Sequence, residues 1–124
     1  MGELTTVLHQ PLAQAEASVR AALAGEGFGV LTEIDVAAVF RAKLDIERGA
    51  LKILGACSPR FAYDALERDA DAALVLPCNV ALEAIDEHTT RVTIADPSLL
   101  MPAPELADLT EGARSRLVRV LAAL

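Results

Sequence analysis

Two hydrophobic periods alternate along the chain, and each predicts one kind of element. Alternating or β-branched runs predict five strands, and apolar residues spaced at about 3.6 predict two long helices. The strands are expected at residues 3–9, 28–34, 50–57, 74–84 and 91–95, and the long helices at residues 11–25 and 105–124.

Short helices are expected between some of these strands. Asp35 directly follows the second strand and offers a carboxylate that caps a helix over 36–44. Ser58 and Pro59 follow the third strand as an N-cap residue and a proline in the first helical turn, and they predict a helix that ends near Asp69.

This order, strand, helix, four strands and helix, predicts an α+β fold in a single domain of residues 1–124. Two long helices would cover one face of a largely antiparallel, five-stranded sheet, giving two layers. Several strands are apolar on both sides, so the second face needs a cover as well. Short helices or a second subunit would supply it, and a homodimer is the simpler prediction.

Composition and charge exclude several partners. The 124 residues are 53% hydrophobic but only 3% aromatic, and they carry a net charge of −7. Nucleic acids and anionic membranes select basic surfaces, so neither is an expected partner. No apolar run is long enough to span a bilayer, and the start of the chain lacks the features of a secretory signal. We therefore expect a soluble, cytoplasmic protein.

Two cysteines carry the most reactive chemistry. Cys57 immediately precedes the predicted helix at Ser58, whose N-terminal dipole favours a thiolate. Cys78 follows Pro77, which breaks a strand ladder, and precedes the amide of Asn79. If neighbouring strands bring the thiols together, they can form a redox pair, carry sulfur or hold a soft metal such as Zn or Cu(I). Two small buried core residues are the alternative.

Three segments together carry a family resemblance: residues 27–36, residues 54–59 with the following Ala62 and Tyr63, and residues 76–80. They resemble the bacterial and archaeal family called domain of unknown function 302, and the likeness covers nearly the whole chain. One departure is Ser58, where the family often has Asn.

The resemblance implies a fold similar to the TATA-binding-protein type and assigns no activity. Its motif positions, expected to converge at strand ends, are Asp35, Lys43, Cys57, Pro59, Tyr63, Pro77, Cys78, Asn79 and Asp96.

The leading hypothesis is a small dimeric domain that binds a small ligand or a soft metal near Cys57 and Cys78. One alternative is a thiol-dependent redox or sulfur-handling enzyme. In it, Cys57 is the nucleophile with a lowered pKa, and Cys78 is the resolving cysteine. The other is a structural or interaction module with both cysteines buried. No cofactor is identified.

Overall fold

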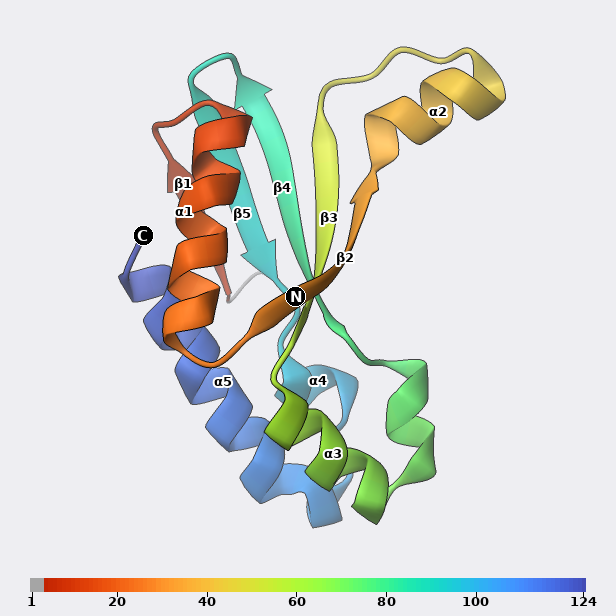
Figure 1. Cartoon of the computed structure of the whole chain (residues 1–124), viewed down its shortest axis with the longest axis vertical. Coiled ribbons are helices and arrows are strands. Elements are labelled where there is room, and N and C mark those ends of the chain that lie inside the picture. Colours follow the sequence, from red (N-terminus) through yellow and green to blue (C-terminus); the bar gives the residue numbers. More distant parts are fainter. Residues whose placement is uncertain (1–3) are drawn as a thin grey trace.

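The computed structural model describes residues 4–124 and contains one antiparallel sheet with the strand order β1-β5-β4-β3-β2 (Figure 1). The strands are β1 (Thr5–Leu8), β2 (Gly29–Asp35), β3 (Leu51–Cys57), β4 (Cys78–Asp86) and β5 (Thr89–Ile94). The helices are α1 (Leu12–Gly25), α2 (Val36–Leu44), α3 (Pro59–Arg68), α4 (Pro97–Leu100) and α5 (Ala107–Ala122). Two short 3-10 turns are η1 (Ala70–Leu74) and η2 (Pro104–Leu106). The expected α+β architecture is confirmed.

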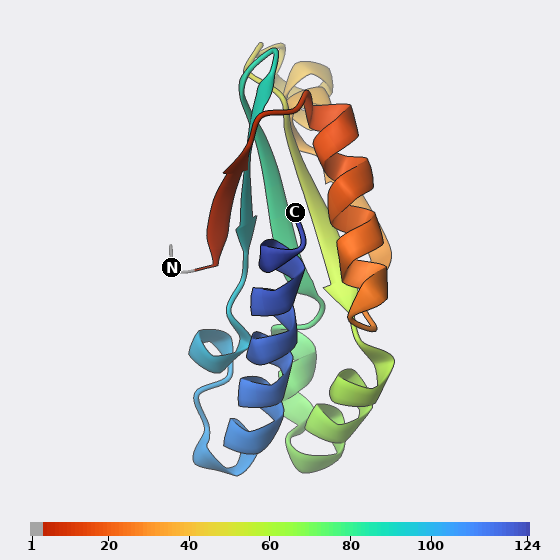
Figure 2. The same cartoon turned by 90° about the vertical axis from the view of Figure 1, so that its left-hand side faces the viewer.

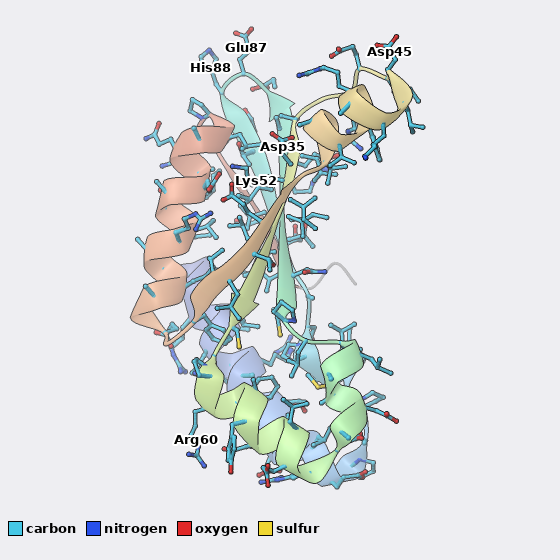
Figure 3. The ribbon with its side chains drawn as sticks, turned by 45° about the vertical axis from the view of Figure 1, so that its right-hand side comes forward. Asp35, Asp45, Lys52, Arg60, Glu87 and His88 are labelled. Carbon is cyan, nitrogen blue, oxygen red and sulfur yellow. The ribbon has the colours of Figure 1, made fainter. Side chains whose placement is uncertain are left out.

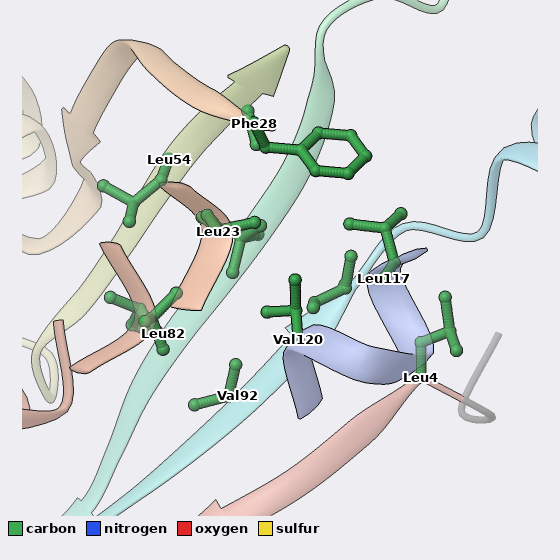
Figure 4. Close-up of a cluster of buried hydrophobic side chains, with 12 residues drawn as sticks. Leu4, Leu23, Phe28, Leu54, Leu82, Val92, Leu117 and Val120 are labelled. Atoms are coloured by element: carbon green, nitrogen blue, oxygen red, sulfur yellow. The ribbon is translucent and has the colours of Figure 1, made fainter. Parts of the chain in front are cut away.

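The main core lies between the sheet and helices α1 and α5, which run alongside each other (Figure 2). Helix positions three and four apart lie on one face, so α1 and α5 each present an apolar stripe to the sheet. The close-up in Figure 4 shows side chains from both helices meeting those of the strands. The labelled members of this cluster are Leu4, Leu23, Phe28, Leu54, Leu82, Val92, Leu117 and Val120.

A second, smaller core lies beyond the end of the sheet, where α3, η1, η2 and the first half of α5 meet (Figure 1). Phe61 and Ala65 from α3 pack there with Met101 and Leu106. Helix α5 is long enough to contribute to both cores, and it therefore ties the end of the sheet to the helical region. Within residues 4–124, no helix has the length and apolar content needed to cross a membrane.

Helix α2 behaves differently, because it projects from the body of the molecule (Figure 1). It begins where the Asp35 carboxylate accepts a hydrogen bond from the Ala38 N–H at 2.9 Å, as the sequence predicted. Only Ala37 is buried, whereas Val39 and Leu44 are exposed. This helix leaves the sheet face opposite α1 and α5, here called the open face, uncovered, although a short helix was one of the two covers considered for it.

Two sequence predictions near prolines are wrong. The strand expected from residue 74 begins only at Cys78, because residues 70–74 form η1 with the Asp69 carboxylate accepting from Asp71 N–H. The sequence analysis predicted no helix between the fifth strand and the last long helix, yet the stretch after Asp96 contains α4. The Asp96 carboxylate caps this helix through Ser98 N–H at 2.9 Å.

Candidate functional site

The pairing of β3 with β4 decides which side chains face each other. Ala56 lies opposite Cys78, and Gly55 lies opposite Asn79. Lys52 on β3 forms an ion pair with Glu16 of α1 at 2.9 Å, so even-numbered positions of β3 face the helices. Because side chains alternate along a strand, Gly55, Cys57 and Asn79 face the open side, and Cys78 faces the helices.

Pro77 closes over Gly55 at the end of these strands. A Cβ atom added to Gly55 would lie 2.8 Å from Pro77 Cγ and 2.1 Å from Thr32 Oγ1. Only glycine leaves room for both neighbours, so this position fixes β2, β3 and the Pro77 ring in close contact on the open face. The Leu76–Pro77 peptide bond is cis.

Two cavities adjoin at Asn79 on the open face, and one of them is lined by Pro77. One, of about 420 Å³, is lined by Pro77 and Asn79 together with Leu74, Val75, Leu76, Ala95 and Leu100. The other, of about 190 Å³, lies along β3, β4 and β5 and is lined by Ile53, Asn79, Ala81, Thr93, Ile94 and Ala95. Both are lined by Asn79 and Ala95, so they adjoin at these residues, and the two together are called the Asn79 groove here.

Asn79 is the polar centre of this groove. Its backbone carbonyl accepts the Ala95 N–H at 2.9 Å, which joins β4 to the end of β5. Its side chain is exposed and makes no hydrogen bond with any side chain or backbone group of residues 4–124. A carboxamide offers two donors and one acceptor oxygen, so the groove combines apolar walls with an unused hydrogen-bonding group.

The two thiols are less reactive than the predicted nucleophile requires. Burial raises the pKa of the half-buried Cys57 thiol above its ordinary value. Burial also raises the pKa of Cys78 to about 11, with further contributions from Cys57 and the Asp96 carboxylate. A raised pKa keeps the thiol protonated at neutral pH, which is the opposite of the thiolate expected from the start of α3.

Within residues 4–124, no third ligand joins Cys57 and Cys78 at the predicted soft-metal site. The register directs Cys57 and Cys78 to opposite faces of the sheet, although the two thiols are close enough for Cys57 to help raise the pKa of Cys78. In the part of the chain that the structure describes, His, Cys, Asp and Glu side chains form no group of three that would hold a metal ion.

Asp96 and Ser58 use their side chains to hold the fold. The buried Asp96 carboxylate accepts from Ser98 and from Arg114 Nε, the latter at 3.0 Å. Burial alone would raise the pKa of Asp96, but these hydrogen bonds outweigh it and lower the pKa below its ordinary value. The Ser58 hydroxyl was expected to cap α3, and it instead accepts a hydrogen bond from Arg116 at 3.1 Å.

The remaining predicted site residues do not converge on the groove. Asp35 pairs with Lys52, whereas Gly29 pairs with Cys57, so Asp35 lies at the other end of β2. Figure 3 shows Asp35 near the projecting helix and Arg60, at the start of α3, toward the opposite end of the molecule. Lys43 lies on α2 and is exposed.

Pro59 and Tyr63 belong to the surface of α3. Pro59 occupies the first turn of the helix and is exposed, as its sequence position predicted. The Tyr63 ring is 57% exposed and lies 5.5 Å from the Arg60 guanidinium. Of the predicted positions, therefore, Pro77 and Asn79 line the groove, and Cys57 shares their face of the sheet.

Sequence reasoning missed the other groove residues, especially Ala81 and Ala95. Ala81 follows Asn79 by two positions in β4, and Ala95 directly follows β5, so alternation along the strands marks both as facing the open side. That signal was present, but only the pairing of β4 with β5 shows that the two alanines line one hollow.

Comparisons with known proteins agree with this fold. The chain is similar to the crystal structure of an uncharacterized conserved DUF302 protein from Bacillus stearothermophilus. The TM-score is 0.87 and the sequence identity 24%, over 96% of this chain and 94% of the other. A comparison with curated proteins finds no match. The profile of the family described as domain of unknown function DUF302 matches residues 4–124, and the chain therefore belongs to that family.

Proposed function

We propose that this protein binds a small, largely apolar molecule carrying one hydrogen-bonding group, and that it does so in the Asn79 groove. The observation that carries this proposal is the unused Asn79 carboxamide at the point where the two cavities meet. Ligand sites typically combine apolar walls with a few placed polar groups that set orientation, and this groove has that composition.

The groove is built from rigid parts, which favours binding over simple surface exposure. Gly55 and Pro77 are in close contact at its edge, and β4 and β5 form its floor. Cys57 lies on the same face with its thiol protonated at neutral pH, so we propose binding without thiol chemistry. The soft-metal and redox alternatives gain no support from this geometry.

Benzamide is a suitable probe, because its ring matches the apolar walls and its amide matches Asn79. Toluene is the matched probe without a polar group. Titration followed by ¹⁵N–¹H NMR should shift the resonances of Asn79, Ala81 and Ala95. An Asn79→Leu variant keeps the groove but loses the carboxamide, so it should bind benzamide no better than toluene.

An Ala81→Phe variant should fill the groove and lower the affinity for both probes. An Arg91→Gln variant on neighbouring β5 changes an exposed residue outside the groove and should bind both probes like the wild type. Shifts confined to other surfaces, or an unchanged preference for benzamide in Asn79→Leu, would contradict the proposal.

We also propose that two copies associate through the apolar arm, defined as residues 34–46. A nine-residue helix is marginal in water, and α2 buries only Ala37. Its last residue, Leu44, is 60% exposed, and the flanking Ile34 and Ile46 are 49% and 50% exposed. Acidic and basic residues balance over residues 35–49, while the whole chain carries −7, so a second copy meets little charge repulsion there.

Light scattering after size-exclusion chromatography tests this association. The wild type should have the mass of a dimer, and Leu44→Glu should have the mass of a monomer. Leu66→Glu on α3 is the control, because Leu66 is also exposed but lies outside the arm. A monomeric wild type at every concentration would rule the arm out as a dimer contact.

A further inference from the structure

A further cavity, of about 490 Å³, lies between α3 and α5, apart from the Asn79 groove. Its charged lining includes Arg60 from α3 and Arg116 and Arg119 from α5, together with the carboxylates of Asp64 and Asp108, which are already paired with Arg60 and Arg68. Phe61, Leu109 and Ala113 give it an apolar wall. A protein with a net charge of −7 thus gathers three guanidinium groups from two helices around one hollow.

Arg116 differs from the other arginines of the chain. Each of the others forms an ion pair with a carboxylate, and these pairs include Arg60 with Asp64 and Arg119 with Glu26. Arg116 has no carboxylate partner within residues 4–124, although most charged side chains of this protein are acidic.

The Arg116 side chain is nevertheless held in place. Its guanidinium lies 4.8 Å from the centre of the Phe28 ring. Its Nη1 atom donates to the Glu26 carbonyl oxygen at 3.2 Å and to the Ser58 hydroxyl oxygen at 3.1 Å. A guanidinium has five N–H donors, and its Nε and Nη2 atoms remain without acceptors in the described part of the chain. The charge is therefore positioned in advance of any ligand, which lowers the entropic cost of binding one.

The geometry points to an anion-binding site, and we propose that the cavity binds an organic oxyanion with its charged group at Arg116 and its apolar body along Phe61 and Leu109. A guanidinium fork matches the paired oxygens of a phosphate or carboxylate. Arg119 lies one turn beyond Arg116 on the same helix and supports the same negative charge. The start of α3 adds the positive end of its dipole beside Arg60.

Gly112 gives the cavity its open floor. An ideal Cβ at Gly112 would have no described atom within 4 Å, so a side chain added there starts in open space. Replacing Gly112 with leucine therefore fills space on the cavity side while leaving Arg116 and its partners unchanged.

The experiment uses phenyl phosphate as the main probe. Inorganic phosphate tests the charged group without the ring, and benzoate tests a carboxylate in place of the phosphate. Calorimetry at low ionic strength gives the affinities. We expect phenyl phosphate to bind more tightly than inorganic phosphate, and salt to weaken both. Arg116→Gln should lower the affinity for phenyl phosphate by about tenfold or more, because a charge-assisted hydrogen bond is lost. Arg116→Lys should restore part of the affinity, since it keeps the charge but loses the fork.

The controls separate this site from the groove and from general charge. Arg91→Gln removes the same charge from the open face, and Asn79→Leu alters only the groove, so both should bind phenyl phosphate like the wild type. Gly112→Leu should no longer bind phenyl phosphate but should still bind inorganic phosphate. Should Arg116→Gln fail to fold, Arg119→Gln replaces it, because Arg119 is 58% exposed and its loss should weaken binding without unfolding the chain.

The proposal is overturned if the wild type binds none of the three probes at millimolar concentrations. Equal affinities of Arg116→Gln, Arg119→Gln and Arg91→Gln would also overturn it, because binding would then depend on net charge alone. Failure of benzamide to bind the groove has no bearing on this result, since the two cavities share no lining residue.

Discussion

Replacement of Gly55 by alanine should destabilise the protein, and the distances around that residue set the size of the effect. The new Cβ would lie 2.1 Å from Thr32 Oγ1 and 2.8 Å from Pro77 Cγ, whereas ordinary contacts begin near 3.4 Å. Thr32 can rotate its hydroxyl away, but the Pro77 ring is rigid. Overpacked positions typically cost about 1–3 kcal/mol. Reduced freedom of the unfolded chain offsets at most about 1 kcal/mol, so we expect a net loss of roughly 2 kcal/mol.

Urea unfolding measures this loss directly, through the midpoint and slope of the transition. Gly25→Ala is the matched control, because no described atom lies within 4 Å of an ideal Cβ there, and its stability should stay close to that of the wild type. In a Thr32→Ala background the hydroxyl clash is gone, so Gly55→Ala should cost less by about 1 kcal/mol.

Two results would refute this reasoning. If Gly55→Ala were as stable as the wild type, Pro77 would not pack over β3 as the structure describes. If Thr32→Ala recovered nothing, the strain would lie with Pro77 alone or elsewhere. A cost shared between Thr32 and Pro77 is therefore the specific signature of this contact on the open face.

Three further predictions concern the thiols, the Asp96 carboxylate and the main core. Iodoacetamide should modify Cys57 more slowly than a free thiol at pH 8, and Cys78 only after unfolding, because burial raises both pKa values, that of Cys78 to about 11. Asp96 has a lowered pKa in the fold, so its stabilisation is present above pH of about 4 and is lost as the pH falls further; Asp96→Asn should flatten that part of a stability-against-pH curve. Leu117→Ala should cost about 2–5 kcal/mol in urea unfolding, because Leu117 is fully buried in the main core.

Much of the fold could be predicted from periodicity and capping residues, because these act locally. Asp35 begins α2 by the contact that its sequence position indicates. The same rule, applied to Asp96 and Pro97, would have predicted α4, since an acidic cap before a proline is the same signal. The stretch before Pro77 was assigned to a strand because apolar runs of that length fit either a strand or a buried turn.

The site was harder to predict, because it depends on how strands pair. The sequence places Cys57 at the end of a strand, and that much is confirmed, but it placed Cys78 inside a strand that in the structure only begins there. Which face each thiol occupies depends on the register, and a shift of one residue would have put both on the same side. Nothing in the sequence singles out Arg116, since the absence of a carboxylate partner is a property of the folded chain.

The residues that looked most functional in the sequence largely serve the fold, and this changes where function should be sought. Asp35 and Asp96 cap helices, and Ser58 accepts a hydrogen bond from α5. Folding satisfies these groups, so a ligand would have to compete with the protein for them. Asn79 and Arg116 are the opposite case, because Asn79 stands on a paired strand, Arg116 is held by two hydrogen bonds, and both keep hydrogen-bonding capacity that residues 4–124 do not use. Capacity left unused at a rigid, cavity-lining position is what binding requires, and it is visible only once every other hydrogen bond has been assigned.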